Sequence, residues 1–201
     1  TNPSWIHTGI YGVGISVRGG NAAIENCNVA SNSGSIRSLG STGSNSFMFG
    51  LGIATMHEAN TVITNTTVQN NTGSIENTQT YYDRAVWAFG AGVSGGINGW
   101  PAMEGDASIE VIDSIISGNT VEFSTPDSGQ KSGGAGIGSF SGWDSNGPSH
   151  NITISTTRTQ VFDNSFAEVT TEETCPDDVN SDGAVNTFDL LSIIDSWGNC
   201  P

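Results

Sequence analysis

The stretch IENCNVASN at residues 24–32 follows the tetrapeptide GVGI at residues 12–15, and this combination recurs along the chain. A Gly-x-Gly pair followed by a β-branched residue is found four times, at intervals of 38, 40 and 44 residues. The glycine pairs are Gly12/Gly14, Gly50/Gly52, Gly90/Gly92 and Gly134/Gly136. Self-similarity at such a period is typical of repeat architectures, in which one supersecondary unit stacks on the next.

An asparagine recurs in register with the glycine pairs, three residues after an apolar β-branched residue. The four asparagines are Asn32, Asn71, Asn119 and Asn164, and the apolar residues before them are Val29, Val68, Ile116 and Val161. Six residues before each asparagine lies a further recurring position, which holds Asn26, Asn65, Asp113 and Arg158. The block therefore reads Asn-x-x-Val-x-x-Asn in the first two copies and drifts in the last two.

Short runs rich in β-branched residues surround these blocks and predict strands at residues 22–29, 61–68, 108–116 and 151–161. Asn and Gly between them supply turns, because both tolerate the left-handed backbone conformation. When identical turns stack, their asparagine side chains can hydrogen-bond to one another along the stack. One copy cannot bury its own apolar face, whereas at least about three stacked copies share a continuous core.

The Gly-x-Gly-Ile and Ile-Glu-Asn-Cys-x-Val-x-x-Asn patterns resemble the repeats of the pectin-lyase-like superfamily over residues 9–166. The resemblance implies an all-β fold, a right-handed parallel β-helix (solenoid), and the handedness comes from the resemblance alone. Periods near 40 residues exceed one plain turn of such a helix, so we expect loops at 33–48, 72–88 and 120–132, with further insertions at 94–107 and 138–150. A β-propeller, whose blades repeat at about 40–45 residues, is the main alternative.

Charge and composition limit the classes of function. The 201 residues carry a formal net charge of −15, from 20 acidic and 5 basic residues. This charge repels phosphate backbones and argues against nucleic-acid binding. An acidic surface with few lysines fits a secreted protein, although solubility alone also explains it. No run of about 18 apolar residues predicts a membrane span, and the start at Thr1 leads us to expect the C-terminal part of a longer chain, with any export signal upstream.

The segment DVNSDGAVNTFD at residues 178–189 has the spacing of a 12-residue calcium-binding loop. Ca²⁺ takes about six to eight oxygen ligands, which such a loop supplies from positions 1, 3, 5, 7, 9 and 12. The expected ligands are Asp178, Asn180, Asp182, the backbone carbonyl of Ala184, Asn186 and Asp189. A short amphipathic helix is predicted after the loop from Leu190, Ile193, Ile194 and Trp197, ending at Gly198.

This loop and helix resemble one repeat of a type I dockerin, in which aspartate takes the place of the usual final glutamate. The resemblance implies a small EF-hand-like loop-helix module at residues 175–201, with a cohesin-like or cell-surface anchoring partner. Residues 165–174 have no repeat register, so we expect a linker at 167–174, which a final capping strand at 166–169 overlaps. Cohesin-binding dockerins carry two such units, and this chain carries one. In the family, loop positions 10 and 11 contact the partner; here these are Thr187 and Phe188, although Phe188 suits a core position equally well.

Cys175 and Cys200 flank the module symmetrically, and we expect them to form a disulfide. Closing such a loop contributes roughly 3–4 kcal/mol on the chain-entropy estimate. The disulfide and Ca²⁺ would then stabilise a unit too small to be stable through its core alone. A disulfide also implies an oxidising compartment. The third cysteine, Cys27, is expected to be an inert buried thiol.

Aromatic residues gather in the expected loops. Trp100 and Trp143 follow glycines in the two insertions, which begin at equivalent points of adjacent repeats. Tyr81, Tyr82 and Trp87 lie in the loop between the second and third repeats. Flat rings beside Asn, Asp and Ser suit stacking on sugars, so Trp100, Trp143, Tyr81 and Tyr82 are candidate polysaccharide contacts. The alternative is that these rings pack against the side of the repeats.

No catalytic residues are assigned. General acid–base catalysis needs groups within hydrogen-bond reach of one another, and the few cations and histidines reproduce no motif of pectate-lyase-like or polygalacturonase-like enzymes. The first interpretation is therefore an extracellular, bacterial-type protein, a non-catalytic adhesin, scaffold or glycan-binding β-helix with a calcium-dependent anchoring module. The second is a polysaccharide lyase or O-glycosyl hydrolase of polysaccharide catabolism, with catalytic residues upstream; it rests on fold analogy.

Overall fold

A computed structural model describes residues 6–38, 44–77, 86–97, 106–124, 130–141 and 152–168. These residues form strands and the turns between them, with no helix among them. Every strand pair in this part of the chain is parallel. The all-β prediction is confirmed for these residues, and the parallel pairing excludes the β-propeller, an antiparallel architecture.

The chain passes through four structural repeats, numbered here in chain order. Repeat 1 contains β1 (Ile6–Tyr11), β2 (Ile15–Glu25), β3 (Asn28–Ala30) and β4 (Ser33–Ser38). Repeat 2 contains β5 (Ser44–Phe49), β6 (Ile53–Thr64), β7 (Thr67–Gln69) and β8 (Thr72–Asn77). Repeat 3 contains β9 (Val86–Phe89), β10 (Val93–Ile97), β11 (Ala107–Ile112), β12 (Ile115–Ser117) and β13 (Thr120–Ser124). Repeat 4 contains β14 (Gln130–Gly133), β15 (Ile137–Ser141), β16 (Ile152–Thr157), β17 (Gln160–Phe162) and β18 (Ser165–Glu168).

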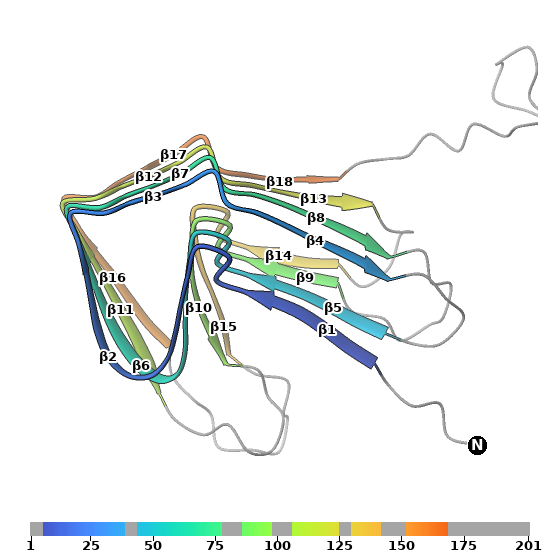
Figure 1. The fold of residues 1–201 in the computed structure, drawn as a ribbon, viewed down its shortest axis with the longest axis horizontal. Coiled ribbons are helices and arrows are strands. Elements are labelled where there is room, and N and C mark those ends of the chain that lie inside the picture. Colours follow the sequence, from blue (N-terminus) through green and yellow to red (C-terminus); the bar gives the residue numbers. More distant parts are fainter. Residues whose placement is uncertain are drawn as a thin grey trace, which may run out of the picture. The chain divides into compact units, whose positions relative to one another are not determined.

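Equivalent strands of successive repeats pair with one another and form four parallel sheets (Figure 1). The first sheet is β1-β5-β9-β14, the third is β3-β7-β12-β17 and the fourth is β4-β8-β13-β18. The second sheet joins β2 to β6, and β6 to both β10 and β11, which pair in turn with β15 and β16. The long strands β2 and β6 of the first two repeats are replaced in the last two repeats by pairs of shorter strands. These pairs are β10 with β11 and β15 with β16, and an insertion lies between the two strands of each pair.

The corners between sheets are formed by residues with a left-handed backbone. Asn26, Asn65, Asp113 and Arg158, the recurring position found in the sequence, all have φ between 48° and 55°. These corners divide the expected strands at 22–29, 61–68, 108–116 and 151–161, so each of those predictions joined two strands that belong to different sheets. The prediction was wrong there because β-branched residues continue on both sides of the corner, so the sequence shows one unbroken run where the structure has two strands.

Two apolar cores run along the stack, beside a third buried cluster of Phe47, Phe49 and Trp87. One is formed by β-branched residues of the second and third sheets, with Ile63, Val68, Val111 and Ile116 all at or below 1% exposure. The other lies between the first and fourth sheets and contains Met48, Leu51, Ile75 and Phe123. Each residue packs on its counterpart in the next repeat, so the core runs continuously along the stack, as the repeat pattern predicts.

The four recurring asparagines form a ladder of hydrogen bonds along the stack. The side-chain nitrogen Nδ2 of each asparagine donates to Oδ1 of the next: Asn32 to Asn71 at 2.8 Å, Asn71 to Asn119 at 2.7 Å and Asn119 to Asn164 at 2.7 Å. The backbone N–H of each donor residue bonds to the same oxygen, at 3.0–3.1 Å. The expected asparagine stacking is therefore confirmed.

Several expected loops are strands instead. The segments expected to protrude at 33–48, 72–88 and 120–132 contribute the fourth and first sheets, from β4 and β5 through to β13 and β14. Trp87, expected in a loop, lies in β9, is 3% exposed, and packs edge-on against Phe47 with ring centroids 5.6 Å apart. Cys27, expected to be buried, is exposed, because it lies in repeat 1 at the end of the stack.

The chain divides into two compact units, residues 1–169 and 170–201, and the described residues belong to the first. Strand β18 (Ser165–Glu168) confirms the capping strand expected at 166–169 as far as the structure describes it, and it pairs in register with β13, so Ala167 and Glu168 belong to the last repeat and not to the linker at 167–174. The predicted calcium loop, its helix and the Cys175–Cys200 disulfide lie outside the described residues. No helix in the described part of the chain is long and apolar enough to cross a membrane.

Candidate functional site

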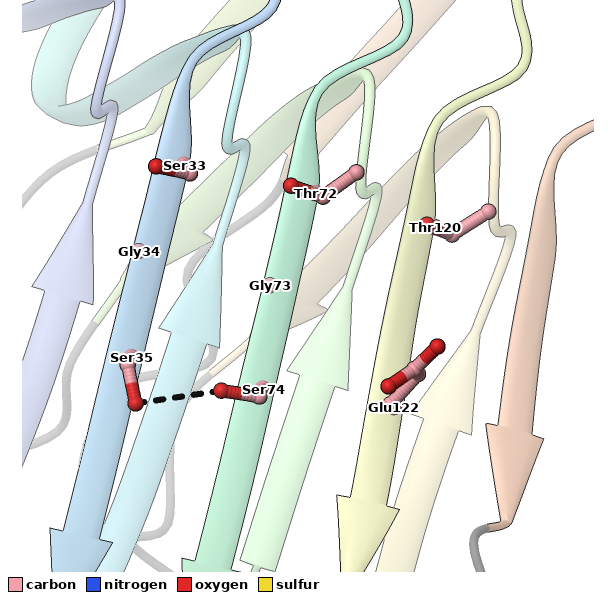
Figure 2. Close-up of a pocket in the computed structure, with 8 residues that line it drawn as sticks. All are labelled: Ser33, Gly34, Ser35, Thr72, Gly73, Ser74, Thr120 and Glu122. Atoms are coloured by element: carbon pink, nitrogen blue, oxygen red, sulfur yellow. Dashed lines mark hydrogen bonds between the residues drawn. The ribbon is translucent and has the colours of Figure 1, made fainter.

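A hollow of about 540 Å³ lies along the outer face of the fourth sheet, across β4, β8 and β13 (Figure 2). Its lining residues are Ser33, Gly34, Ser35, Thr72, Gly73, Ser74, Thr120 and Glu122. Parallel pairing fixes their register: Ser33, Thr72 and Thr120 form one row, and Ser35, Ser74 and Glu122 form the next. The rows run across the strands, so the hollow extends along the stack of repeats.

Strand alternation explains why hydroxyl groups line this hollow. Ile36, Ile75 and Phe123 point into the core and are 1–3% exposed, while Ser33, Ser35 and Thr72 point outward and are exposed. The Ser74 hydroxyl donates to the Ser35 hydroxyl at 3.0 Å. Such a surface can donate and accept hydrogen bonds with a polyol, and Glu122 adds one exposed carboxylate. Among the eight lining residues, Glu122 is the only titratable group, so the hollow offers no second group for general acid–base catalysis.

The described arginines lie apart from this hollow or form ion pairs along the outside of the stack. Arg158 donates through Nη2 to Oδ2 of Asp113 at 2.7 Å, which bridges two corners of adjacent repeats. The hydrogen bonds from Arg158 hold the pKa of the Asp113 carboxyl below its usual value, and those same bonds raise the pKa of Arg158. Arg37 pairs with Glu76 at 2.8 Å across β4 and β8. Both pairs are exposed, so each adds little to stability.

His57 occupies a bend in the middle of β6. Both His57 and Glu58 have left-handed backbone conformations, with φ of 52° and 58°, and they lie opposite the single residue Gly19, because Arg18 pairs with Met56 and Gly20 pairs with Ala59. Nη2 of Arg18 lies 3.4 Å from Nε2 of His57. Burial, and then the positive charge of Arg18, lowers the pKa of His57, so the ring is neutral at neutral pH. No carboxylate of the described ranges hydrogen-bonds to either of these two side chains.

The stems of the two tryptophan-bearing insertions, which are the strands on either side of each insertion, pair between repeats 3 and 4. The chain leaves β10 at Ile97, which pairs with Ser141, the residue at which it leaves β15. It returns at Ala107, which pairs with Ile152 at the start of β16. The prediction that both insertions begin at equivalent points of adjacent repeats is confirmed, with starts at residues 98 and 142, four residues later than expected. Trp100 and Trp143 themselves, and Tyr81 and Tyr82, lie outside the described residues.

The predicted metal ligands are not among the described residues. Asp178, Asn180, Asp182, Ala184, Asn186 and Asp189, with the partner contacts Thr187 and Phe188, all fall in 169–201. Within the ranges that the structure describes, no group of three or more His, Cys, Asp or Glu side chains could hold a metal ion. The calcium site therefore stays a prediction from the sequence.

Sequence reasoning missed the hollow because it assigned these residues to loops. The signal was present: SGSI at residues 33–36 and TGSI at residues 72–75 match in register, with a hydroxyl residue at the first and third positions of each. Comparison of the chain with protein-family models, curated proteins and solved structures gave no match. The assignment of function consequently rests on the residues and their geometry.

Proposed function

We propose that this chain is a non-catalytic, extracellular β-helix that presents polysaccharide-binding loops and is anchored by a C-terminal calcium module. The stacked parallel repeats are those of a right-handed parallel β-helix resembling the pectin-lyase-like superfamily. The module at residues 175–201 is a single dockerin-like repeat that binds one Ca²⁺ and attaches the protein to a cohesin-like or cell-surface partner.

The paired stems of the insertions are the observation that carries the polysaccharide-binding role. Because Ile97 pairs with Ser141 and Ala107 with Ile152, both insertions leave and rejoin neighbouring strands, which are spaced about 4.8 Å apart. Each insertion contains a Gly-Trp pair, at residues 99–100 and 142–143. Two insertions on adjacent repeats, each with a tryptophan, can offer two rings to the repeating apolar faces of a polysaccharide, where one insertion would offer a single ring.

The surroundings of the described charged residues support a role without catalysis. Arg158 and Arg37 each bind a carboxylate that belongs to the neighbouring repeat, and Arg18 adjoins a neutral His57. These arginines therefore join one repeat to the next. The hydroxyl-lined hollow on the fourth sheet offers hydrogen bonds to sugars in the same way, without a paired acid and base.

Affinity electrophoresis on a panel of neutral and acidic polysaccharides tests the binding role. We expect the Trp100→Ala/Trp143→Ala variant to lose at least about tenfold in affinity, since buried tryptophans dominate many binding interfaces. Phe162→Ala, which removes an exposed ring on β17, is the matched control and should bind as the unaltered chain does. Equal weakening by both variants contradicts the proposal. Release of reducing ends or unsaturated products that Glu122→Gln abolishes would instead establish an enzyme.

Isothermal titration with Ca²⁺ tests the module separately. We expect one Ca²⁺ per chain, with binding lost in Asp178→Ala and in Asp182→Ala, because each substitution removes a charged ligand from the loop. Asp163→Ala, which removes a carboxylate at an exposed corner of repeat 4, is the control and should leave the titration unchanged. Unaltered binding in both loop variants contradicts the ligand assignment.

A further inference from the structure

The hollow on the fourth sheet presents two rows of polar side chains that run along the stack (Figure 2). One row has a hydroxyl group in every repeat, at Ser33, Thr72, Thr120 and Ser165. The other row holds Ser35, Ser74 and Glu122. Neighbours within a row are about 4.8 Å apart, the spacing of adjacent strands, and the rows are separated by two residues, or about 6.5 Å. The hollow therefore offers hydrogen-bonding groups at regular intervals, which suits a polymer of similar units.

The charge of this hollow is negative. Arg37 is the only basic residue of β4, β8 and β13, and its Nε lies 2.8 Å from Oε2 of Glu76. Glu122 is exposed, and its carboxylate has no ion-pair or hydrogen-bond partner among the described residues. The chain's net charge of −15 adds to the negative potential. An acidic sugar would therefore be repelled here, whereas a cationic sugar would be attracted.

We propose that this hollow binds an oligosaccharide of amino sugars, with sugar hydroxyls along the two rows and one ammonium group on Glu122. Serine and threonine hydroxyls both donate and accept hydrogen bonds, so they match the hydroxyls of a sugar. The ammonium group only donates, and the carboxylate of Glu122 only accepts. This charged hydrogen bond is roughly twice as strong as a neutral one, so it selects an amino sugar over a neutral sugar.

This inference rests on the proposed polysaccharide-binding role and assigns to it a second site with a defined class of ligand. The hollow belongs to the fourth sheet, whereas the stems of the tryptophan-bearing insertions belong to the second sheet. The two sites therefore consist of separate residues, and substitutions can test them one at a time.

Titration of the 201-residue chain with the tetramer of glucosamine, followed by amide NMR shifts, tests the site. At about 0.15 M NaCl the Debye length is about 8 Å, so attraction to the overall net charge is screened. We expect the largest shifts within β4, β8 and β13, and at least about threefold weaker binding of the neutral N-acetylated tetramer. Shifts spread evenly over the acidic residues of all four sheets, or equal binding of the two tetramers, would overturn the proposal.

Two matched pairs of variants locate the binding groups. Glu122→Gln should weaken binding of the glucosamine tetramer about threefold to fivefold, because it removes the carboxylate charge. Glu110→Gln, at an exposed glutamate of β11, changes the net charge equally and should alter binding by no more than about 1.5-fold. Thr72→Val replaces the hydroxyl with a methyl group and should weaken binding about threefold, whereas Thr67→Val on β7 should not. Equal effects within either pair contradict the assignment.

Spermidine and the tryptophan variant separate this site from two alternatives. Spermidine carries ammonium groups without sugar hydroxyls, so it should bind more weakly than the tetramer and be unaffected by Thr72→Val. Spermidine binding as tight as that of the tetramer would mean that the hydroxyl rows contribute nothing, and the proposal would be wrong. The Trp100→Ala/Trp143→Ala variant should bind the tetramer as the unaltered chain does. Tetramer binding lost in this variant but kept in Glu122→Gln would place the amino sugar on the insertions, which contradicts the hollow as its site and leaves the proposed function intact.

Discussion

Replacing Asn119 by alanine is expected to lower the free energy of unfolding by about 3–5 kcal/mol. Asn119 is fully buried, and its side chain donates to the Val68 carbonyl at 3.0 Å and to Oδ1 of Asn164 at 2.7 Å. Its Oδ1 accepts from the backbone and side chain of Asn71. Alanine leaves the Asn71 N–H buried without this partner, at about 1–3 kcal/mol, and removes the side-chain hydrogen bonds to the Val68 carbonyl and to Asn164, at about 1 kcal/mol each.

Urea denaturation of Asn119→Ala beside Asn60→Ala measures this effect. Asn60 belongs to a second, exposed ladder, in which it donates to Asn21 at 3.1 Å and accepts from Ser108 at 2.7 Å. Water replaces those bonds, so Asn60→Ala should change stability by no more than about 0.5 kcal/mol. A similar loss in both variants would mean that burial of the ladder does not determine its contribution.

Replacing Gly90 by alanine should destabilise the fold by about 2–5 kcal/mol. Gly90 has φ of 55°, which costs an L-residue about 1–2 kcal/mol. An added methyl group would also lie 2.0 Å from the Val93 carbonyl oxygen and 2.8 Å from the Gly138 nitrogen. Both are backbone atoms, so the corner must shift, and such overpacking costs about 1–3 kcal/mol more.

Gly20→Ala separates the two contributions. Gly20 has φ of 76°, and an added methyl group would meet nothing within 4 Å. Only the backbone penalty applies, so we expect a loss of about 1–2 kcal/mol, measured by the same urea titration with circular dichroism to confirm retained strand content. Equal losses at Gly20 and Gly90 would show that close packing at the glycine corner contributes nothing.

The sequence predicted the features that depend on recurring Asn and Gly, because these residues suit turns in which few others fit. Asn71 and Asn119 were placed in one column because an amide that recurs at a fixed offset after Val68 or Ile116 can hydrogen-bond to its copies along the stack. The turns at the glycine pairs were also predicted. At Gly52 and Gly92, a side chain would meet the backbone of the next repeat. The equivalent starting points of the two tryptophan-bearing insertions were predicted from the alignment of the repeats.

The strands of the first and fourth sheets were missed for a physical reason. SGSIRS in β4 and TGSIEN in β8 contain one apolar residue each, and Gly and Ser have low β-propensity. These segments become strands because Ile36 and Ile75 are buried between copies that lie 39 residues apart in the chain. That burial exists only after stacking, so no local pattern reports it. The hydroxyl-lined hollow lies on these same strands and was missed with them.

The exposure of Cys27 could not be predicted from the local sequence either. Cys27 occupies the column of Thr66 and Ser114, which are 1% and 2% exposed, yet Cys27 is exposed because it lies in repeat 1. Its sulfur donates only to the Glu25 carbonyl, at 3.1 Å. A residue's burial in a repeat protein depends on which repeat it belongs to as much as on its own side chain.

Nuclear Overhauser contacts among the carboxamide protons of Asn32, Asn71, Asn119 and Asn164 test the stacked parallel repeats most directly. The stack predicts contacts in the order 32–71, 71–119 and 119–164, because each Nδ2 lies 2.7–2.8 Å from the next Oδ1. It also predicts slow hydrogen exchange of the buried Asn71 and Asn119 side chains. Contacts that skip a repeat, or fast exchange with no contact between neighbouring asparagines, would contradict the stacking of the four repeats.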